Sequence, residues 1–291
     1  MSTSPGASPS RQIRRIGILL GDLGKFDKSK TVLQFLVLQM NTLQKTFEYE
    51  FLPVDYNDTF IQKLSSMAPV DMNEVIREIP AFIKRYGKYL DEEREGYGLK
   101  EKASTSPLVL ITMACLENRN YIMGRDGFAI LTLGYYWKGY MAPPSLIEYI
   151  LTLLVRISVG FVCPPLESYI HLGTRGCLFD LTSNLNEFRL KFLNGFICHS
   201  CCHILESEGF SELPKELSLI LKKDWLGKAS EPEKPAGVAA KLGYDLFTTR
   251  GPQPTLWETA KKTLQEEWVK QVLAIIGAIV LAALLVWFRL K

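Results

Sequence analysis

A stretch rich in cysteine and histidine, residues 171–202, constrains the fold of this chain more than any other feature. Cys198 and Cys201 form a C-x-x-C pair, and Cys177 lies upstream with 20 residues between. Two ligands from one tight turn and two from a distant turn are typical of a closed tetrahedral zinc site. We therefore predict one structural zinc ion, with these ligands: Cys177, Cys198, Cys201 and His171, with Cys163 as an alternative fourth ligand.

Two other interpretations of the same cysteines stay open. Free cysteine is often only a small buried hydrophobic residue, and a C-x-x-C pair can instead carry redox chemistry. Disulfides are not expected, because the N-terminus lacks the apolar core of a secretory signal and the thiols should stay reduced. The net charge of +3 does not indicate a nucleic-acid partner, and we expect none.

The hydrophobic pattern predicts an α/β (α+β) fold. A helix over 31–47 lies between apolar strands at 16–20 and 49–54, which is a β-α-β unit with parallel strands. A helix over 71–90 and a polar surface loop over 91–106 follow. The remaining predicted elements are strands at 107–112 and 128–133, and a buried central helix that Ser145 caps and that runs to about Val159. We expect a mixed sheet with packed helices and a zinc-knuckle-like Cys/His element.

The order of these elements and several short motifs resemble the archaemetzincins, zinc peptidases of the metzincin class. The resemblance covers about residues 16–205. Residues 110–116, 121–124 and 128–133 are similar to the family's third strand, its Phe-Gly-Ala-type turn and its edge strand. The motifs around Cys177 and at 198–201 resemble the Cys-x-Met turn and the closing C-x-x-C that hold the family's structural zinc. The resemblance implies a zincin-like fold.

The chain departs from this family where catalysis would take place. The family's helix carries H-E-x-x-H, but the corresponding helix, residues 146–156, contains no histidine. His171 could match the family's third catalytic histidine, but one histidine cannot hold a catalytic zinc ion. Catalysis through Glu148 or Glu167 is not expected, and residues 163–167 should not be regular helix. Arg156 should form a salt bridge or extend to solvent, or else line the vacated cleft and bind an anionic ligand.

The sequence divides into four parts. Residues 1–11 should be disordered, 12–226 should form the globular domain and 227–254 should be a linker. The last part, 255–291, should be an amphipathic lead-in and a transmembrane helix, whose span of about 271–288 lies between Trp268 and Arg289. We expect a single-pass membrane protein with a cytoplasmic globular domain. Its partner is then the lipid bilayer, through 271–288, and small residues around Gly277 would permit homo-oligomers.

Three functions are compatible with this organisation. The first is a membrane-tethered, catalytically inactive metzincin-like domain that acts in binding or regulation and has a structural zinc. The second is a membrane effector whose soluble part senses a ligand or a partner and whose span oligomerises or perturbs the bilayer. The third is a zinc-dependent protease with unconventional ligands. The sequence favours the first and does not indicate the protein partner or small ligand.

Overall fold

The structure is a computed structural model. It describes residues 13–23, 27–66, 68–99, 107–117, 120–134, 145–168, 171, 176–180, 191–192, 195–244 and 264. The predicted N-terminal tail, most of the lead-in and the predicted membrane span at 271–288 therefore lie outside the described residues. Within the described part, no helix is both long enough and apolar enough to span a membrane.

A five-stranded mixed sheet forms the centre of the fold, with the strand order β2-β1-β4-β7-β6. The first four strands in this order are parallel, and β6 pairs antiparallel with β7 at one edge. Their bounds are β1 (Arg14–Leu20), β2 (Phe47–Phe51), β4 (Leu108–Thr112), β6 (Ile122–Arg125) and β7 (Phe128–Thr132). A separate parallel pair joins β3 (Pro69–Val70) to β5 (Cys115–Leu116). The mixed α/β fold and the parallel β-α-β opening are thus confirmed.

The edge strand differs from the expectation. The family resemblance assigned the edge to residues 128–133, but β7 lies inside the sheet between β4 and β6. The edge is β6, whose segment has a weak strand pattern of only four residues. All five residues of β7 are buried, because neighbouring strands and helices cover it on every side.

Helix α1 (Asp27–Met40) is shorter than the predicted helix over 31–47. The Gln44 side-chain oxygen accepts hydrogen bonds from the backbone N–H groups of Thr46 and Phe47, at 2.8 and 2.9 Å. This local turn ends the helical stretch, and Phe47 is then buried as the first residue of β2. The apolar periodicity continued past the end of the helix because the following strand is also buried.

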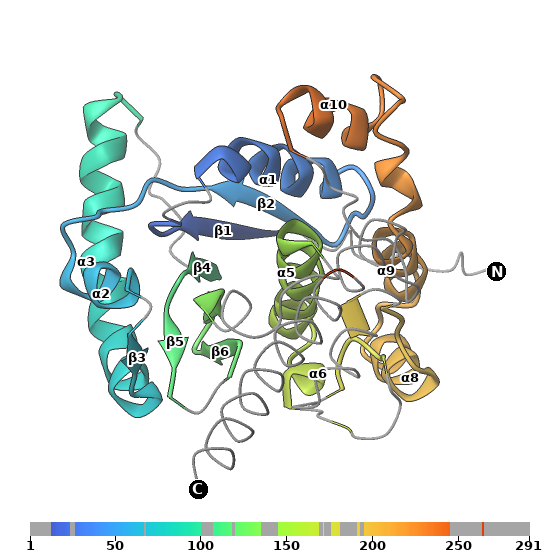
Figure 1. Ribbon diagram of the computed structural model, residues 1–291. Coiled ribbons are helices and arrows are strands. Elements are labelled where there is room, and N and C mark those ends of the chain that lie inside the picture. Colours follow the sequence, from blue (N-terminus) through green and yellow to red (C-terminus); the bar gives the residue numbers. More distant parts are fainter. Residues whose placement is uncertain are drawn as a thin grey trace, which may run out of the picture.

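Helices cover both faces of the sheet (Figure 1). One face packs against α2 (Thr59–Leu64) and α3 (Met72–Gly96), and the other packs against α1 and α5 (Leu146–Val162). Successive residues of β4 point to opposite faces: Leu108 and Leu110 belong to the core with α3, whereas Val109 and Ile111 belong to the core with α5. The sheet therefore separates two hydrophobic cores.

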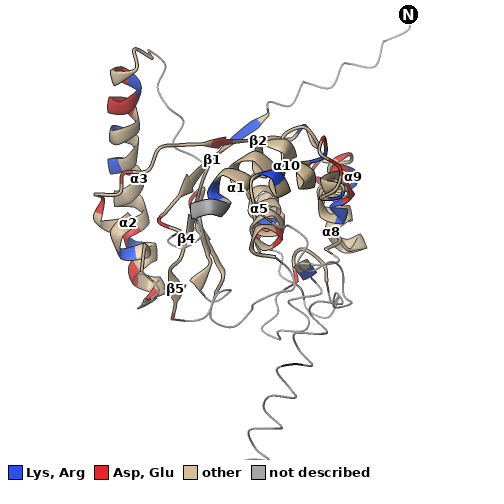
Figure 2. Ribbon diagram, turned by 45° about the horizontal axis from the view of Figure 1, so that its top comes forward, with Lys and Arg blue, Asp and Glu red and all other residues tan. Residues whose placement is uncertain are grey.

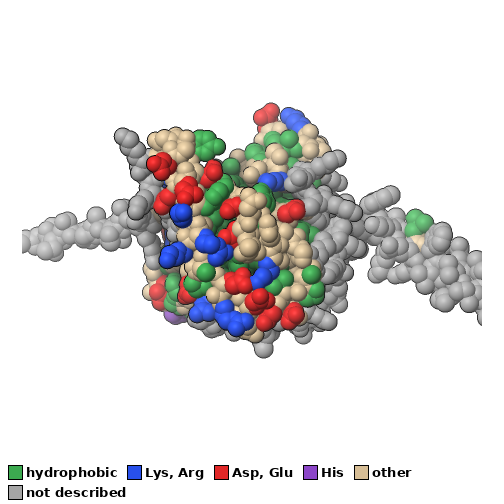
Figure 3. All heavy atoms as spheres, turned by 90° about the vertical axis from the view of Figure 1, so that its left-hand side faces the viewer, with side chains coloured by type: hydrophobic (Ala, Val, Ile, Leu, Met, Phe, Trp, Pro, Cys, Tyr) green, Lys and Arg blue, Asp and Glu red, His purple; other side chains and the backbone are tan. Residues whose placement is uncertain are grey.

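Helix α3 begins where the sequence predicts and ends later. Asp71 caps its N-terminus by accepting from the N–H of Asn73 at 2.9 Å, and the helix continues to Gly96 through part of the predicted loop over 91–106. Its outer side carries charges of both signs (Figure 2). Acidic and basic side chains are also interspersed on the molecular face that α2 and α3 form (Figure 3). The charged run at 91–96 therefore lies in the last turns of a solvated helix.

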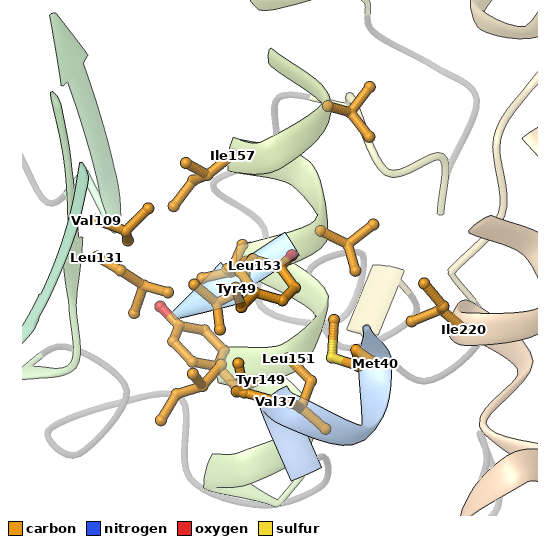
Figure 4. Close-up of a cluster of buried hydrophobic side chains, with 14 of the residues drawn as sticks. Val37, Met40, Tyr49, Val109, Leu131, Tyr149, Leu151, Leu153, Ile157 and Ile220 are labelled. Carbon is orange, nitrogen blue, oxygen red and sulfur yellow. The ribbon is translucent and has the colours of Figure 1, made fainter. Parts of the chain in front are cut away.

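The predicted central helix is confirmed as α5. Ser145 and Glu148 form a capping box at its start. The Ser145 hydroxyl accepts from the backbone N–H of Glu148 at 3.2 Å, and the Glu148 carboxylate accepts from the backbone N–H of Ser145 at 3.0 Å. Nearly every side chain of α5 is buried, with Arg156 and Val162 as the partly exposed residues. Figure 4 shows α5 between Val109 and Leu131 of the sheet and side chains from α1 and α9.

Five short elements complete the described chain. They are α6 (Pro164–Ser168), α8 (His199–Ser207), α9 (Leu213–Lys222), the 3-10 turn η2 (Asp224–Leu226) and α10 (Pro235–Lys241). The expectation that 163–167 is not helical is wrong, because α5 ends at Cys163 and the two prolines then begin a new turn of helix.

The predicted linker over 227–254 also needs correction. Helix α10 lies inside it, and Ala236 and Ala239 are buried in the same core as α1. The backbone oxygen of Glu231 would lie only 1.9 Å from a Cβ at position 237, so a glycine is needed there. Nothing in the sequence indicated that these small residues contribute to a core. Their small size is what lets α10 pack closely against the backbone of Glu231. The globular part therefore extends to at least Tyr244.

Candidate metal centre

Four side chains from three separate segments converge at one end of α8. They are His171, Cys177, Cys198 and Cys201, and their ligand atoms all lie within 4.8 Å of one another. Cys177 and Cys201 are fully buried, whereas His171 and Cys198 are partly exposed. Within the described part of the chain, this is the one group of at least three potential ligands that is close enough for a metal ion.

Backbone pairing brings the first two ligands to this position. Cys177 forms a parallel bridge with Phe196, and the N–H of Leu178 donates to the Phe196 carbonyl at 2.8 Å. Gly176 precedes Cys177 with φ of 123°, a backbone conformation that other residues rarely adopt. A second parallel bridge joins His171 to Asp180. The turn at 176–180 therefore lies against both the C-x-x-C segment and His171.

Helix α8 positions the other two ligands. Cys198 is its N-cap and Cys201 lies in its first turn, so both thiols lie at the positive end of the helix dipole. The backbone N–H of Cys198 also donates to the sulfur of Cys177 at 3.4 Å. Helix N-termini and N–H donors favour the thiolate, which is the form of cysteine that binds metal.

The distances fit a tetrahedral zinc ion. With Zn–S of about 2.3 Å and Zn–N of about 2.0–2.1 Å, a regular tetrahedron has edges of roughly 3.8 Å between sulfurs and roughly 3.5 Å between sulfur and nitrogen. The Cys177 and Cys201 sulfurs are 3.9 Å apart, and His171 Nε2 lies 3.2 and 3.4 Å from the sulfurs of Cys201 and Cys198. Three thiolates and one imidazole are a donor set that zinc prefers, so these residues form a site for one zinc ion.

Without a cation, this set of thiols cannot all ionise together. The hydrogen bond between the Cys177 and Cys201 sulfurs, aided by backbone N–H groups, lowers the pKa of Cys177. The same interaction with Cys177, together with burial, raises the pKa of Cys201. One thiolate is therefore favoured and the next is disfavoured, and a divalent cation removes this penalty by neutralising their charges.

Asp180 supports the metal centre from outside the ligand shell. Its Oδ1 lies 2.7 Å from His171 Nδ1, which leaves Nε2 directed at the sulfurs. Its Oδ2 accepts from the backbone N–H groups of Gly176 and Cys177, at 2.8 and 3.0 Å. Carboxylates in this position fix the tautomer and orientation of a metal-binding histidine. The sequence analysis missed Asp180, although its place three residues after Cys177 was a usable signal.

The other candidate residues lie apart from the cluster. Cys163 is the C-cap of α5 and does not belong to the four-residue group, so His171 takes the fourth position. Glu148 forms part of the capping box of α5, and its Oε1 lies 3.7 Å from Lys223 Nζ. Glu167 is exposed. Arg156 donates to the Tyr121 hydroxyl and the Asp180 carbonyl, at 3.3 and 3.4 Å, and forms no salt bridge within the described residues.

Comparisons with known proteins give two similar solved structures. One is archaemetzincin from Methanopyrus kandleri, 13% identical with a TM-score of 0.43, where the match covers 69% of this chain and 98% of the other. The second is a zinc-dependent peptidase from Methanocorpusculum labreanum, 16% identical with a TM-score of 0.38, where the match covers 65% and 99%. No family model and no curated protein matches the sequence.

Proposed function

We propose that this chain is a membrane-tethered binding or regulatory protein on an archaemetzincin-like scaffold, with a structural rather than a catalytic zinc ion. The observation that carries the proposal is the closed ligand set: four protein side chains fill the four positions of a tetrahedral site. A hydrolytic zinc site keeps one position open for water. Because protein side chains fill all four positions, the ion would cross-link three segments of the chain, those that contain His171, Cys177 and the Cys198–Cys201 pair.

The distribution of histidines supports the inactive interpretation. The chain has three histidines, of which His171 lies in the cluster. His199 and His203 are exposed on α8, away from the helix α5 on which H-E-x-x-H would be expected. Helix α5 contains no histidine, and nearly all of its side chains are packed into the core. A second, catalytic zinc ion would need ligands that these residues do not supply.

The membrane part of the proposal rests on the sequence alone. Residues 272–288 contain no charged residue, and a tryptophan and basic residues flank them, as at membrane interfaces. In this proposal the segment anchors the globular part on the cytoplasmic side, and small residues around Gly277 allow the spans of two copies to associate. A membrane effector, in which a ligand makes the span perturb the bilayer, would use the same segment.

The zinc proposal is tested by elemental analysis of the purified full-length chain. One zinc ion per chain is expected in the wild type and none in Cys198→Ser. Because a structural zinc contributes folding free energy, the variant should also melt about 10 °C lower, for a loss of a few kcal/mol. The matched control is Cys202→Ser, a neighbouring half-buried cysteine outside the cluster, which should keep the ion.

Three outcomes would contradict parts of the proposal. A wild type without zinc, or an unchanged melting temperature of Cys198→Ser, would overturn the structural zinc site. Two zinc ions per chain with chelator-sensitive peptide cleavage would restore the protease hypothesis. Leakage of liposomes only on addition of a ligand, lost when residues 269–291 are deleted, would favour the membrane effector.

A further inference from the structure

Two cationic side chains lie together behind the metal centre. Lys191 is fully buried, and its Nζ donates to the Asp180 carbonyl at 2.6 Å and to the Tyr121 hydroxyl at 3.3 Å. Arg156, from α5, donates to the same two oxygen atoms at 3.4 and 3.3 Å. The cations therefore share both acceptors, and their like charges repel at short range.

In the part of the chain that the structure describes, no carboxylate forms an ion pair with either cation. The oxygens that accept from Lys191 and Arg156 belong to a carbonyl and a phenol, which are both neutral. Lys223, a lysine that is only partly buried, instead has its Nζ 3.7 Å from Glu148 Oε1. A buried ammonium group without a counter-charge costs several kcal/mol, so Lys191 stays charged only where a nearby negative charge compensates it.

Among the described residues, the negative charges that act on Lys191 are those of Asp180 and of the metal ligand Cys177. Burial and the charge of Arg156 lower the pKa of Lys191 to about 6, whereas the charges of Asp180 and Cys177 act in the opposite direction. A zinc ion with three thiolates and a neutral imidazole has a net charge of about −1, the sum of +2 and −3. The Asp180 carboxylate adds one further negative charge. The loaded centre and Asp180 together thus balance the two cations.

We propose that Lys191 and Arg156 are the counter-cations of the zinc centre, and that they couple zinc binding to the central helix. This inference rests on the zinc site proposed above. Arg156 extends from α5, and the ring of Phe192, next to Lys191, lies 4.8 Å from that of Tyr149 on the same helix. The loaded centre and Asp180 keep negative charge beside both cations, which hold the Asp180 carbonyl and with it the turn that carries Cys177. The two residues are positioning residues and do not bind the ion.

The test compares the zinc affinity of Lys191→Met with that of the wild type, by competition with a chromophoric chelator. Methionine keeps the length and the apolar stem of lysine but removes its charge. We expect binding about 10- to 100-fold weaker, as for other residues that support metal ligands from outside the first shell. Lys191→Arg, which keeps the charge, should recover part of the loss. The cobalt-substituted protein should keep the absorption of a three-thiolate tetrahedral site, because the ligands are unchanged.

Lys223→Met is the matched control. It removes a partly buried lysine, which donates to the backbone oxygen of Phe192, but Glu148 compensates this charge. It should destabilise the zinc-loaded and the zinc-free protein alike and leave the zinc affinity unchanged. Lys191→Met should instead reduce the rise in melting temperature that zinc produces, without lowering the melting temperature of the zinc-free protein.

The outcomes separate this inference from the proposal on which it rests. If the wild type binds no zinc, the structural zinc site is wrong and this inference falls with it. If the wild type binds one zinc ion and Lys191→Met binds it equally well, the site stands and the counter-cations are disproved. If Lys191→Met does not fold, Arg156→Gln at a half-buried position decides the question by the same affinity measurement.

Discussion

Asp180 shows how one carboxylate organises a metal site from outside it. One oxygen orients His171, and the other accepts hydrogen bonds from the backbone N–H groups of Gly176 and Cys177. Both oxygens of Asp180 thus face hydrogen-bond donors. A carboxylate is therefore required here, because an amide would direct its own NH₂ group at a donor on one of the two sides.

We predict that Asp180→Asn weakens zinc binding by roughly 10-fold or more while the four ligands remain in place. The amide cannot accept from His171 and from both backbone groups, so the histidine loses its fixed orientation. Chelator competition measures the change. Asp91→Asn, at an exposed position on α3, is the control. Equal zinc affinity in Asp180→Asn and the wild type would show that Asp180 does not position His171.

At the scale of the elements, several ion pairs join α2 and its N-cap to α3: Lys63 pairs with Glu74 and Glu78, and Asp58 pairs with Arg85. Asp58 caps α2 by accepting from the N–H of Phe60 at 2.8 Å, and Arg85 of α3 donates to both of its oxygens at 2.7 and 3.0 Å. Burial alone would raise the pKa of Asp58, but Arg85 and the backbone N–H groups together lower it below its usual value. The aspartate therefore stabilises both the helix end and the contact between the two helices.

We predict that Asp58→Asn lowers the free energy of unfolding by about 1–2 kcal/mol at pH 7. A carboxyl group with a lowered pKa in the folded state adds stability above about pH 4, and this contribution is lost as the pH falls through the folded-state pKa. The difference between the variant and the wild type should therefore shrink toward pH 2–3. Urea unfolding across this range measures it.

The control for this pH dependence is Glu92→Gln. Glu92 lies in the exposed pair with Lys88, where both side chains are more than half exposed, so little effect is expected at any pH. A difference between Asp58→Asn and the wild type that stays constant from pH 7 to pH 2 would show that the ionised carboxylate does not stabilise the α2–α3 contact.

Helix boundaries were harder to predict than the helices themselves. Ser145 was the predicted cap of α5 and is its N-cap, and the helix predicted over 71–90 begins at Met72, one residue after its expected start. The ends depended on contacts that the local pattern does not contain. Helix α1 ends before the turn that Gln44 stabilises ahead of β2. Helix α3 continues through charged residues, whose side chains are solvated equally well in a loop and in a helix.

At the scale of the whole molecule, α10 closes the core beside α1. Ala236 and Ala239 are buried and Gly237 fits against the Glu231 backbone, although this stretch of the sequence has the composition of a linker. A domain that ended at residue 226 would expose the surface that α10 covers. The helix therefore belongs to the folded unit that also contains the metal centre.

We predict that a fragment of residues 1–244 folds cooperatively and binds one zinc ion, whereas a fragment of residues 1–226 melts roughly 5–10 °C lower. Loss of the apolar contacts of α10 should cost a few kcal/mol, which produces a shift of this size in a domain of about 200 residues. Calorimetry of the two fragments tests this. Equal melting temperatures would mean that α10 contributes nothing to the core.

The sequence by itself determined the donor chemistry of the zinc site and the main elements of the sheet. Cys177, Cys198 and Cys201 were recognisable because thiolates at such spacings have few other uses inside a reduced protein, and buried strands are recognisable as short apolar runs. Both signals are local, and they depend on residue type and spacing alone.

Only the tertiary structure decided how the site is completed and supported. It placed His171 rather than Cys163 with the thiols, and it brought Asp180 and Lys191 behind them. It also made β6 the edge strand and α10 part of the core. The physical reason is the same in each case: the energy of these contacts depends on distance through space, and segments far apart in the chain supply the two partners.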